Sequence, residues 1–204
     1  MFIHTQPPKH YLGYTVEGKA PVILIPGIFG KWGFYKHLGD KISLEGHPVY
    51  IVPKLGYNLK DIPTSASLVR EVIDENNLKN CIIVAHSKGG LISKYLLIHL
   101  NKDNRVKGVI SIATPYSGSS MARLLPLNRI MELDGDSKII KDLASHSEVN
   151  KEIVSISPVF DNMVWAKEGS FLKGAENIKI DEKGHHKILF NKELEKLILQ
   201  RLSN

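Results

Sequence analysis

The stretch Cys81-Ile82-Ile83-Val84-Ala85-His86-Ser87-Lys88-Gly89-Gly90 decides the fold that we predict. Its first five residues form an unbroken apolar run, typical of a strand covered on both faces, and an amphipathic pattern follows Gly90. Ser87 therefore lies where a buried strand turns into a helix, between the small residues Ala85 and Gly89. This arrangement indicates a strained turn with an exposed hydroxyl beside the free N–H groups of a helix start. The alternative is an ordinary serine N-cap next to a glycine.

Short apolar runs alternate with amphipathic segments along the whole chain, which predicts an α/β fold with a doubly wound, mostly parallel sheet in one domain, residues 1–204. The predicted strands are residues 22–25, 48–52, 81–85, 109–112, 153–156 and 177–180. Helices are expected after a Thr64 cap, after Gly90, over residues 137–144 and after an Asn191 cap. Ligands bind at the carboxyl ends of the strands in such sheets, so the chemistry is expected in the loops that follow them.

The loop Ile25-Pro26-Gly27-Ile28-Phe29-Gly30 follows the first predicted strand. Its glycines allow a turn that aims a backbone N–H toward the same crevice as Ser87. A phosphate-binding P-loop needs four residues between its glycines, whereas Gly27 and Gly30 are separated by two. A simple glycine-rich turn is the other interpretation.

A serine nucleophile needs a base, and the base needs a carboxylate that orients it. Asp161 and His185 both follow predicted strands, in the chain order that this fold uses. Asp134 and Asp136 are expected as helix caps, and His86 as a support for its neighbours. The pair His185-His186 raises the question of a metal, but no second ligand pair at zinc spacing accompanies it, so we expect no metal. No dinucleotide-binding G-x-G-x-x-G motif occurs either, and we expect no cofactor.

The composition excludes several classes of protein. The chain has 204 residues, 43% of them hydrophobic, with a net charge of +6 and one cysteine, Cys81. Its lysines are interspersed with acidic residues, so we expect no nucleic-acid partner. No apolar run approaches the ~20 residues of a membrane span, so no stable membrane insertion is expected. The lone cysteine and the lack of a secretory leader pattern predict a cytoplasmic protein.

Five segments of this sequence resemble motifs of the α/β-hydrolase superfamily, and within it of small, lid-less bacterial lipases and esterases. The resemblance runs from about Pro21 to Leu202. Ala85–Gly90 resembles the A-H-S-x-G-G turn of that family, and Pro26–Gly30 its H-G-x-x-G loop. The other three segments are residues 113–119, 161–164 and 184–189.

The resemblance implies that Ser87 is the nucleophile, His185 the base and Asp161 the residue that orients it. It also implies an oxyanion hole made by the backbone N–H groups of Ile28 and Lys88. Two residues depart from the family pattern: Pro26 replaces the usual histidine, which puts the support of the loop in question, and Ala85 replaces the more widespread glycine.

The segment between Ile112 and Ile153 is too short for a folded cap domain, though long enough for a flap of one helix. Phe29, Trp32, Met121 and Leu124, together with Ile28, are expected to line an apolar acyl site, although Met121 and Leu124 are alternatively core residues. The sequence thus predicts a serine hydrolase that cleaves small-molecule or lipid esters through an acyl-enzyme. A thioesterase or acyltransferase, or a non-catalytic binding protein of the same fold, are the alternatives.

Overall fold

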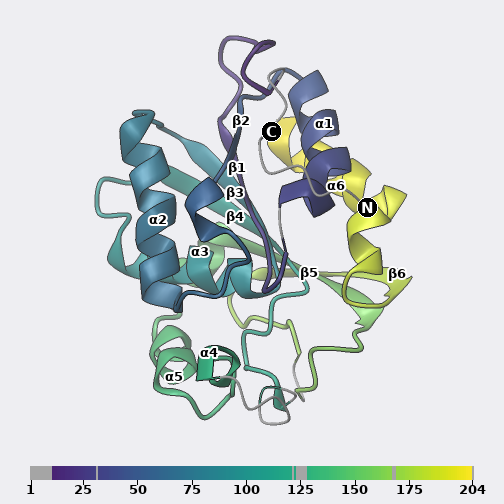
Figure 1. Cartoon of the computed structure of the whole chain (residues 1–204). Helices are drawn as coiled ribbons and strands as arrows, with labels where there is room; N and C mark the ends of the chain where they lie inside the picture. The colour runs from purple at the N-terminus through teal and green to yellow at the C-terminus, as the bar shows by residue number, and fades with distance from the viewer. Residues whose placement is uncertain (1–10, 31, 121, 123–127, 167–168, 204) are drawn as a thin grey trace.

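A six-stranded parallel sheet with strand order β2-β1-β3-β4-β5-β6 forms the centre of the protein (Figure 1). The computed structural model describes residues 11–30, 32–120, 122, 128–166 and 169–203. The strands are β1 (Val22–Ile25), β2 (Val49–Ile51), β3 (Cys81–His86), β4 (Val106–Ile112), β5 (Ile153–Phe160) and β6 (Glu176–Lys183). The predicted doubly wound α/β fold is confirmed, and the pairs between these strands are all parallel.

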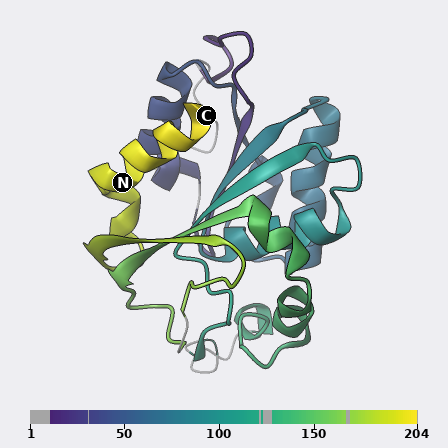
Figure 2. The same cartoon turned by 180° about the vertical axis from the view of Figure 1, so that it is seen from behind.

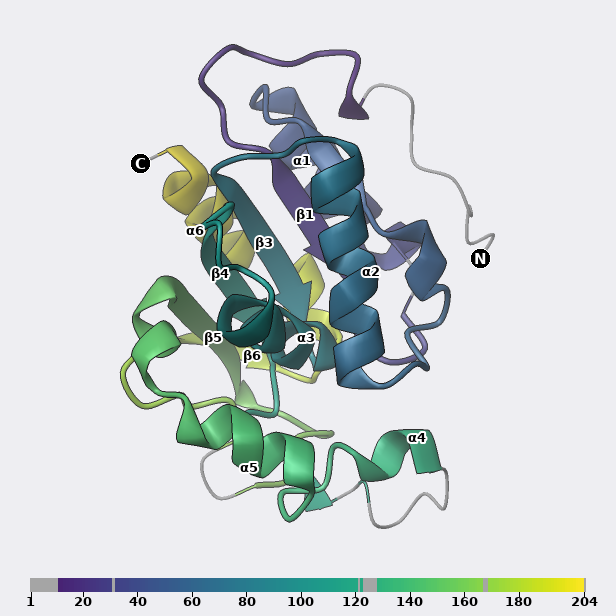
Figure 3. The same ribbon diagram turned by 90° about the vertical axis from the view of Figure 1, so that its left-hand side faces the viewer.

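Helices cover both faces of the sheet (Figure 3). One face carries α1 (Lys36–Leu44) and α6 (Lys192–Ser203), and the other carries α2 (Ile62–Glu75) and α3 (Lys88–His99). Successive residues of β3 point to opposite faces of the sheet. Ile83 packs in the core on the α2 and α3 side, whereas Val84 packs in the core on the α1 and α6 side. This double burial is the physical reason for the continuous apolar runs. Short 3-10 helices span Trp32–Tyr35, Pro53–Leu55, Glu148–Glu152 and Lys187–Phe190.

The helix starts follow local capping chemistry, and the cap of α2 differs from the prediction. Helix α2 is capped by Asp61, whose side chain accepts a hydrogen bond from the Thr64 N–H at 2.7 Å, so Thr64 is not the cap. Asn191 caps α6 as predicted, accepting from the Glu193 N–H at 2.8 Å. The helix expected over residues 137–144 is α5 (Lys138–Ser145).

The turn before α5 differs from the prediction. Ser137 caps this helix, because its side chain accepts from the Ile140 N–H. Asp134 instead accepts from the N–H of Asp136 at 2.8 Å, which closes a local turn upstream of the helix. Neither aspartate is therefore the N-cap of α5.

The segment between β4 and β5 lies beyond the carboxyl ends of the strands (Figures 1 and 2). Its described part contains α4 (Asn128–Met131) as well as α5, so it holds one more short helix than the sequence predicts. No cap domain is formed in the described chain. Instead, this short insert faces the edge of the sheet where the candidate site lies.

The chain order places two loops side by side at that edge. Strand β1 pairs with β2 on one side and with β3 on the other, and Ile25 at the end of β1 is in register with Ala85 near the end of β3. The loops after β1 and β3 therefore leave the sheet as neighbours, at the point where the winding direction reverses. These are the loops that carry Ile28 and Ser87.

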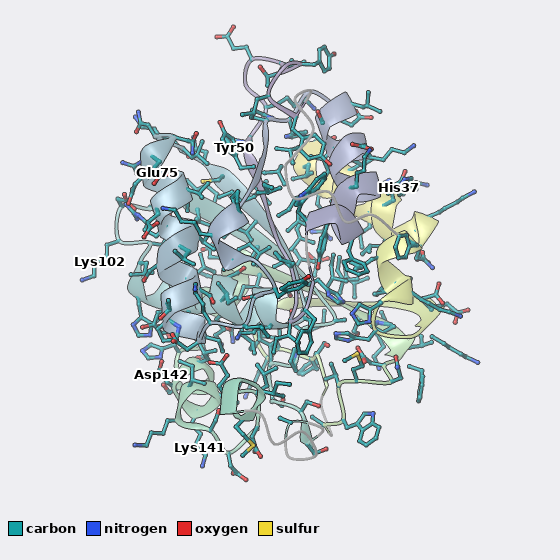
Figure 4. All side chains as sticks on the ribbon, viewed as in Figure 1. His37, Tyr50, Glu75, Lys102, Lys141 and Asp142 are labelled. Atoms are coloured by element: carbon teal, nitrogen blue, oxygen red, sulfur yellow. The ribbon has the colours of Figure 1, made fainter. Side chains whose placement is uncertain are left out.

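Charged side chains are spread over the outer surface. Figure 4 shows Glu75, Lys102 and Lys141 projecting away from the body of the protein, and all three are exposed. Acidic and basic residues alternate there, as Lys141 and Asp142 do on α5. Within the described ranges, no helix is both long and apolar enough to span a bilayer.

Candidate active site

The turn between β3 and α3 has the strained geometry that the sequence predicts. Ser87 has φ 53° and ψ −124°, outside the ordinary regions for a non-glycine residue, and α3 begins at the next residue. Gly89 is required because a Cβ at this position would lie 2.5 Å from the Ile25 carbonyl oxygen. A Cβ at Gly27 would likewise lie 2.9 Å from the Ser87 Cβ. The two loops are therefore in direct backbone contact.

Two backbone N–H groups remain available beside Ser87. Among the residues that the structure describes, neither the Ile28 N–H nor the Lys88 N–H has a hydrogen-bond acceptor. The Lys88 N–H belongs to the first residue of α3, where the helix dipole is positive. An anionic oxygen in front of Ser87 would find both a free donor and a favourable field here.

Asp161 and His185 are joined directly. Asp161 follows the last residue of β5, and its Oδ2 lies 2.8 Å from Nδ1 of His185. Its Oδ1 accepts from the N–H groups of Met163 at 2.8 Å and Val164 at 2.9 Å. Burial raises the pKa of Asp161, but the hydrogen bonds from His185 and the backbone outweigh it, so the pKa lies below its ordinary value. An ionised carboxylate only accepts, so Nδ1 of His185 carries a proton and Nε2 is free to accept one.

The loop that carries His185 is supported from two sides. Asn162 Oδ1 accepts from the His185 N–H at 2.9 Å, a role that the sequence analysis missed although Asn162 follows Asp161 directly. His86 Nε2 lies 2.9 Å from the His185 carbonyl oxygen, which can only accept. Burial and the nearby His185 lower the pKa of His86 to about 3, so His86 is a neutral donor here. The expected supporting role of His86 agrees with this contact.

Ser87 and His185 line the same cavity, which has a volume of about 100 Å³. Phe29 and Ile28 line it, as expected. Trp32 does not: it is buried in the core on the α1 and α6 side, edge-on to Tyr11, where burial of its large apolar ring is favourable. Met121 and Leu124 lie outside the described residues. The remaining lining residues are Pro115, Ser119, Ala122, Ile130, Leu133, Met163 and Val164.

The sequence alone does not identify several of these lining residues, for different reasons. Ile130 and Leu133 come from the insert between β4 and β5, whose path is set by tertiary contacts. Met163 and Val164 follow Asp161 directly, and their N–H groups bind its carboxylate, so the same turn builds the acid site and a cavity wall. Within the described ranges, no group of three or more His, Cys, Asp or Glu side chains is arranged to bind a metal ion.

A buried ion pair ties the insert to the serine turn. The Lys88 side chain is fully buried, and its Nζ contacts the Glu132 carboxylate and the Lys60 carbonyl oxygen, the latter at 2.5 Å. The other Glu132 oxygen accepts from the Ile62 N–H at 3.0 Å, at the start of α2. Glu132 stands between the cavity residues Ile130 and Leu133, so this ion pair fixes one wall of the cavity.

Glu132→Ala should therefore lower the free energy of unfolding by about 3–5 kcal/mol, because it leaves the buried Lys88 ammonium without its direct carboxylate partner. Urea unfolding followed by circular dichroism measures this loss. Glu71→Ala is the matched control, since Glu71 pairs with Lys54 on the exposed surface, and its effect should be much smaller. Equal stability of the two variants would contradict the structural importance of the buried pair.

Comparison with known proteins shows the family of this chain. Residues 20–137 match the family model described as alpha/beta hydrolase fold. The structure of the Bacillus licheniformis lipase BlEst2 in its mature form is similar, with a TM-score of 0.71 and 17% identity, covering 97% of this chain and 96% of that one. So is MGS-MChE2, an alpha/beta hydrolase enzyme from the metagenome of lagoon sediments at Mar Chica, Morocco, with a TM-score of 0.67, 17% identity and 91% of each chain covered.

A third similar structure comes from work on carboxylesterases of the thaumarchaeon Nitrososphaera gargenis. It has a TM-score of 0.68 and 14% identity, and covers 93% of this chain and 92% of that chain. At these identities the three structures show a shared fold. Because the family model matches more than half of the chain, the protein belongs to the alpha/beta hydrolase fold family.

Proposed function

We propose that the protein is a serine hydrolase that cleaves carboxylic esters through an acyl-enzyme. The observation that carries the proposal is the 2.8 Å hydrogen bond between Asp161 and His185, with His185 and Ser87 lining one cavity. The free N–H groups of Ile28 and Lys88 beside Ser87 supply the oxyanion hole that this chemistry requires. Nucleophile, base, orienting carboxylate and oxyanion donors are thus gathered at one edge of the sheet.

The proposed reaction has two steps. Ser87 Oγ attacks the ester carbonyl carbon while His185 Nε2 takes its proton, and the carbonyl oxygen becomes an anion bound by the two N–H groups. The tetrahedral intermediate expels the alcohol, which receives the proton from His185, and leaves an acyl group on Ser87. Water then attacks this acyl-enzyme with the same base, and releases the carboxylic acid. Asp161 stabilises the protonated imidazole without taking its proton. The scheme uses no cofactor.

The size and lining of the cavity support a short acyl group. Its walls are mainly apolar side chains, and its volume is about 100 Å³. An apolar cavity of roughly 150 Å³ accommodates benzene with its six carbons, so this one suits an acyl chain of about four carbons. The lipase and carboxylesterase descriptions of the similar structures agree with ester cleavage.

Hydrolysis of p-nitrophenyl esters with acyl chains from acetyl to dodecanoyl tests this proposal. We expect kcat/KM to rise about fourfold for each added methylene while the cavity fills, since a buried methylene contributes about 0.8 kcal/mol. The rise should end near butanoyl. A kcat/KM that continues to rise to dodecanoyl would contradict the short acyl site, although it would leave the ester chemistry intact.

The same assay separates ester cleavage from the thioesterase and binding-protein alternatives. Matched butanoyl thioesters and oxygen esters should show that the oxygen ester is turned over at least as fast, whereas a strong thioester preference would indicate a thioesterase. A chain that hydrolyses neither and does not react with a fluorophosphonate would be a binding protein.

A further inference from the structure

The loop that carries Ile28 begins with a proline, Pro26. Pro26 occupies the position where a histidine is usual, and a proline side chain forms no hydrogen bonds. The support comes instead from Asn58, a fully buried residue in the segment after β2. Its Nδ2 donates to the Pro26 carbonyl oxygen at 2.6 Å. This carbonyl can only accept, which fixes the orientation of the Asn58 amide.

The residue next to Asn58 anchors the other end of the same loop. The Tyr57 carbonyl oxygen accepts from the Phe29 N–H at 2.8 Å. Between these two anchors, the Gly27 carbonyl oxygen accepts from the Gly30 N–H at 3.0 Å. The Gly27 carbonyl and the Ile28 N–H belong to one planar peptide group and point in opposite directions. Fixing the carbonyl therefore fixes the direction of the Ile28 N–H.

Asn58 is itself held in an unusual conformation. Its φ is +55°, in the left-handed region that asparagine tolerates better than most residues. Its N–H donates to the Leu55 carbonyl oxygen at 2.8 Å. Ser65 Oγ lies 3.5 Å from Asn58 Oδ1 and 3.3 Å from the Lys60 carbonyl oxygen, so these two acceptors share one proton. Asn58 thus gives its strongest side-chain hydrogen bond to Pro26.

We propose that Asn58 is a positioning residue, which holds the Pro26–Phe29 loop so that the Ile28 N–H faces the oxyanion formed at Ser87. This inference rests on the proposed function. It assigns the support of this loop to a residue after β2, through the Asn58 hydrogen bond to the Pro26 carbonyl oxygen. Asn58 acts only through the backbone of Ile28, so its effect should appear in the transition state more than in substrate binding.

Asn58→Gly tests the proposal, because glycine accepts the positive φ and removes only the side chain. Loss of a whole oxyanion donor lowers kcat by about 10²–10³-fold, so a misdirected donor should lower it by roughly 10–100-fold, with KM for p-nitrophenyl butanoate changed less than about threefold. The affinity for a butyl trifluoromethyl ketone, which forms a tetrahedral adduct with a reactive serine, should fall by the same factor as kcat/KM. A merely structural role would not couple these two quantities.

Asn80→Gly is the matched control, since Asn80 is exposed and has φ +53°. It should keep wild-type kcat. If Asn58→Gly does not fold, Asn58→Asp keeps the side-chain size but faces the Pro26 carbonyl with an acceptor, and should lose at least as much kcat. Wild-type kcat in a folded Asn58 variant, or an equal loss in Asn80→Gly, would overturn the proposal while esterase activity stands. A wild-type chain inert toward all esters would overturn the proposed function, and this inference with it.

Discussion

Ser87→Ala should lower the turnover of p-nitrophenyl butanoate by about four to six orders of magnitude and leave the fold intact. Alanine removes the attacking oxygen, while the free N–H groups of Ile28 and Lys88 stay in place. The backbone at Ser87 is already strained at φ 53°, and alanine carries the same Cβ, so the substitution adds no strain. Turnover and thermal melting of the same preparation measure both expectations.

Ser119→Ala is the control for this variant, because Ser119 lines the same cavity. Its Oγ donates to the Met163 carbonyl oxygen at 2.8 Å, so its proton is engaged in that hydrogen bond. Turnover should stay within about tenfold of the wild type, a change in the activation barrier below about 1.4 kcal/mol. If Ser119→Ala is the inactive variant and Ser87→Ala the active one, the nucleophile has been assigned to the wrong serine.

His185→Ala should lose nearly as much turnover as Ser87→Ala, because the members of a catalytic triad act as a unit. His185 is buried, contacts Asp161 through Nδ1 and lines the cavity with Ser87. The double variant Ser87→Ala/His185→Ala should therefore be hardly slower than either single variant. Additive losses in the double variant would show that the two residues work independently.

The adjacent His186 provides the matched control for His185. It is exposed, and its ring only packs against His86 and His185, with centroids 5.4 and 5.1 Å away. His186→Ala should lose no more than about tenfold in turnover, near 1.4 kcal/mol in the barrier. The reverse order of the two histidine variants would identify His186 as the base.

The parts of the fold that the sequence predicts well depend on local patterns. The six apolar runs correspond to the six described strands. In β1 and β3 the cause is burial on both faces of the parallel sheet, which demands continuous hydrophobicity. Strand β6 lies at the edge of the sheet, and among its residues Ile180 alone is buried. The turn at Ser87 was predictable from its small neighbours, since a side chain at Gly89 would collide with the Ile25 carbonyl. Asp161 and His185 follow β5 and β6 in the structure, as the sequence order predicts, and they are joined by a hydrogen bond.

What could not be predicted depends on partners that are distant in the chain. Asn58 contacts Pro26 and Glu132 contacts Lys88, and no local pattern relates such pairs. Lysine side chains are mostly exposed, so the sequence gives no sign that the Lys88 side chain is buried or that it forms an ion pair. Trp32 was expected in the cavity for its apolar ring alone, but the same property suits the core, where it lies.

Covalent labelling distinguishes a nucleophilic Ser87 in an acyl-transfer site from a serine with a structural role only. The wild-type chain is treated with a fluorophosphonate, digested, and the modified peptide is identified by mass spectrometry, with His185→Ala treated in parallel. We predict one phosphonyl group per chain, on Ser87, and a labelling rate at least about 10²-fold lower without the base. An adduct on any other residue, or no adduct on the wild-type chain, would contradict the account.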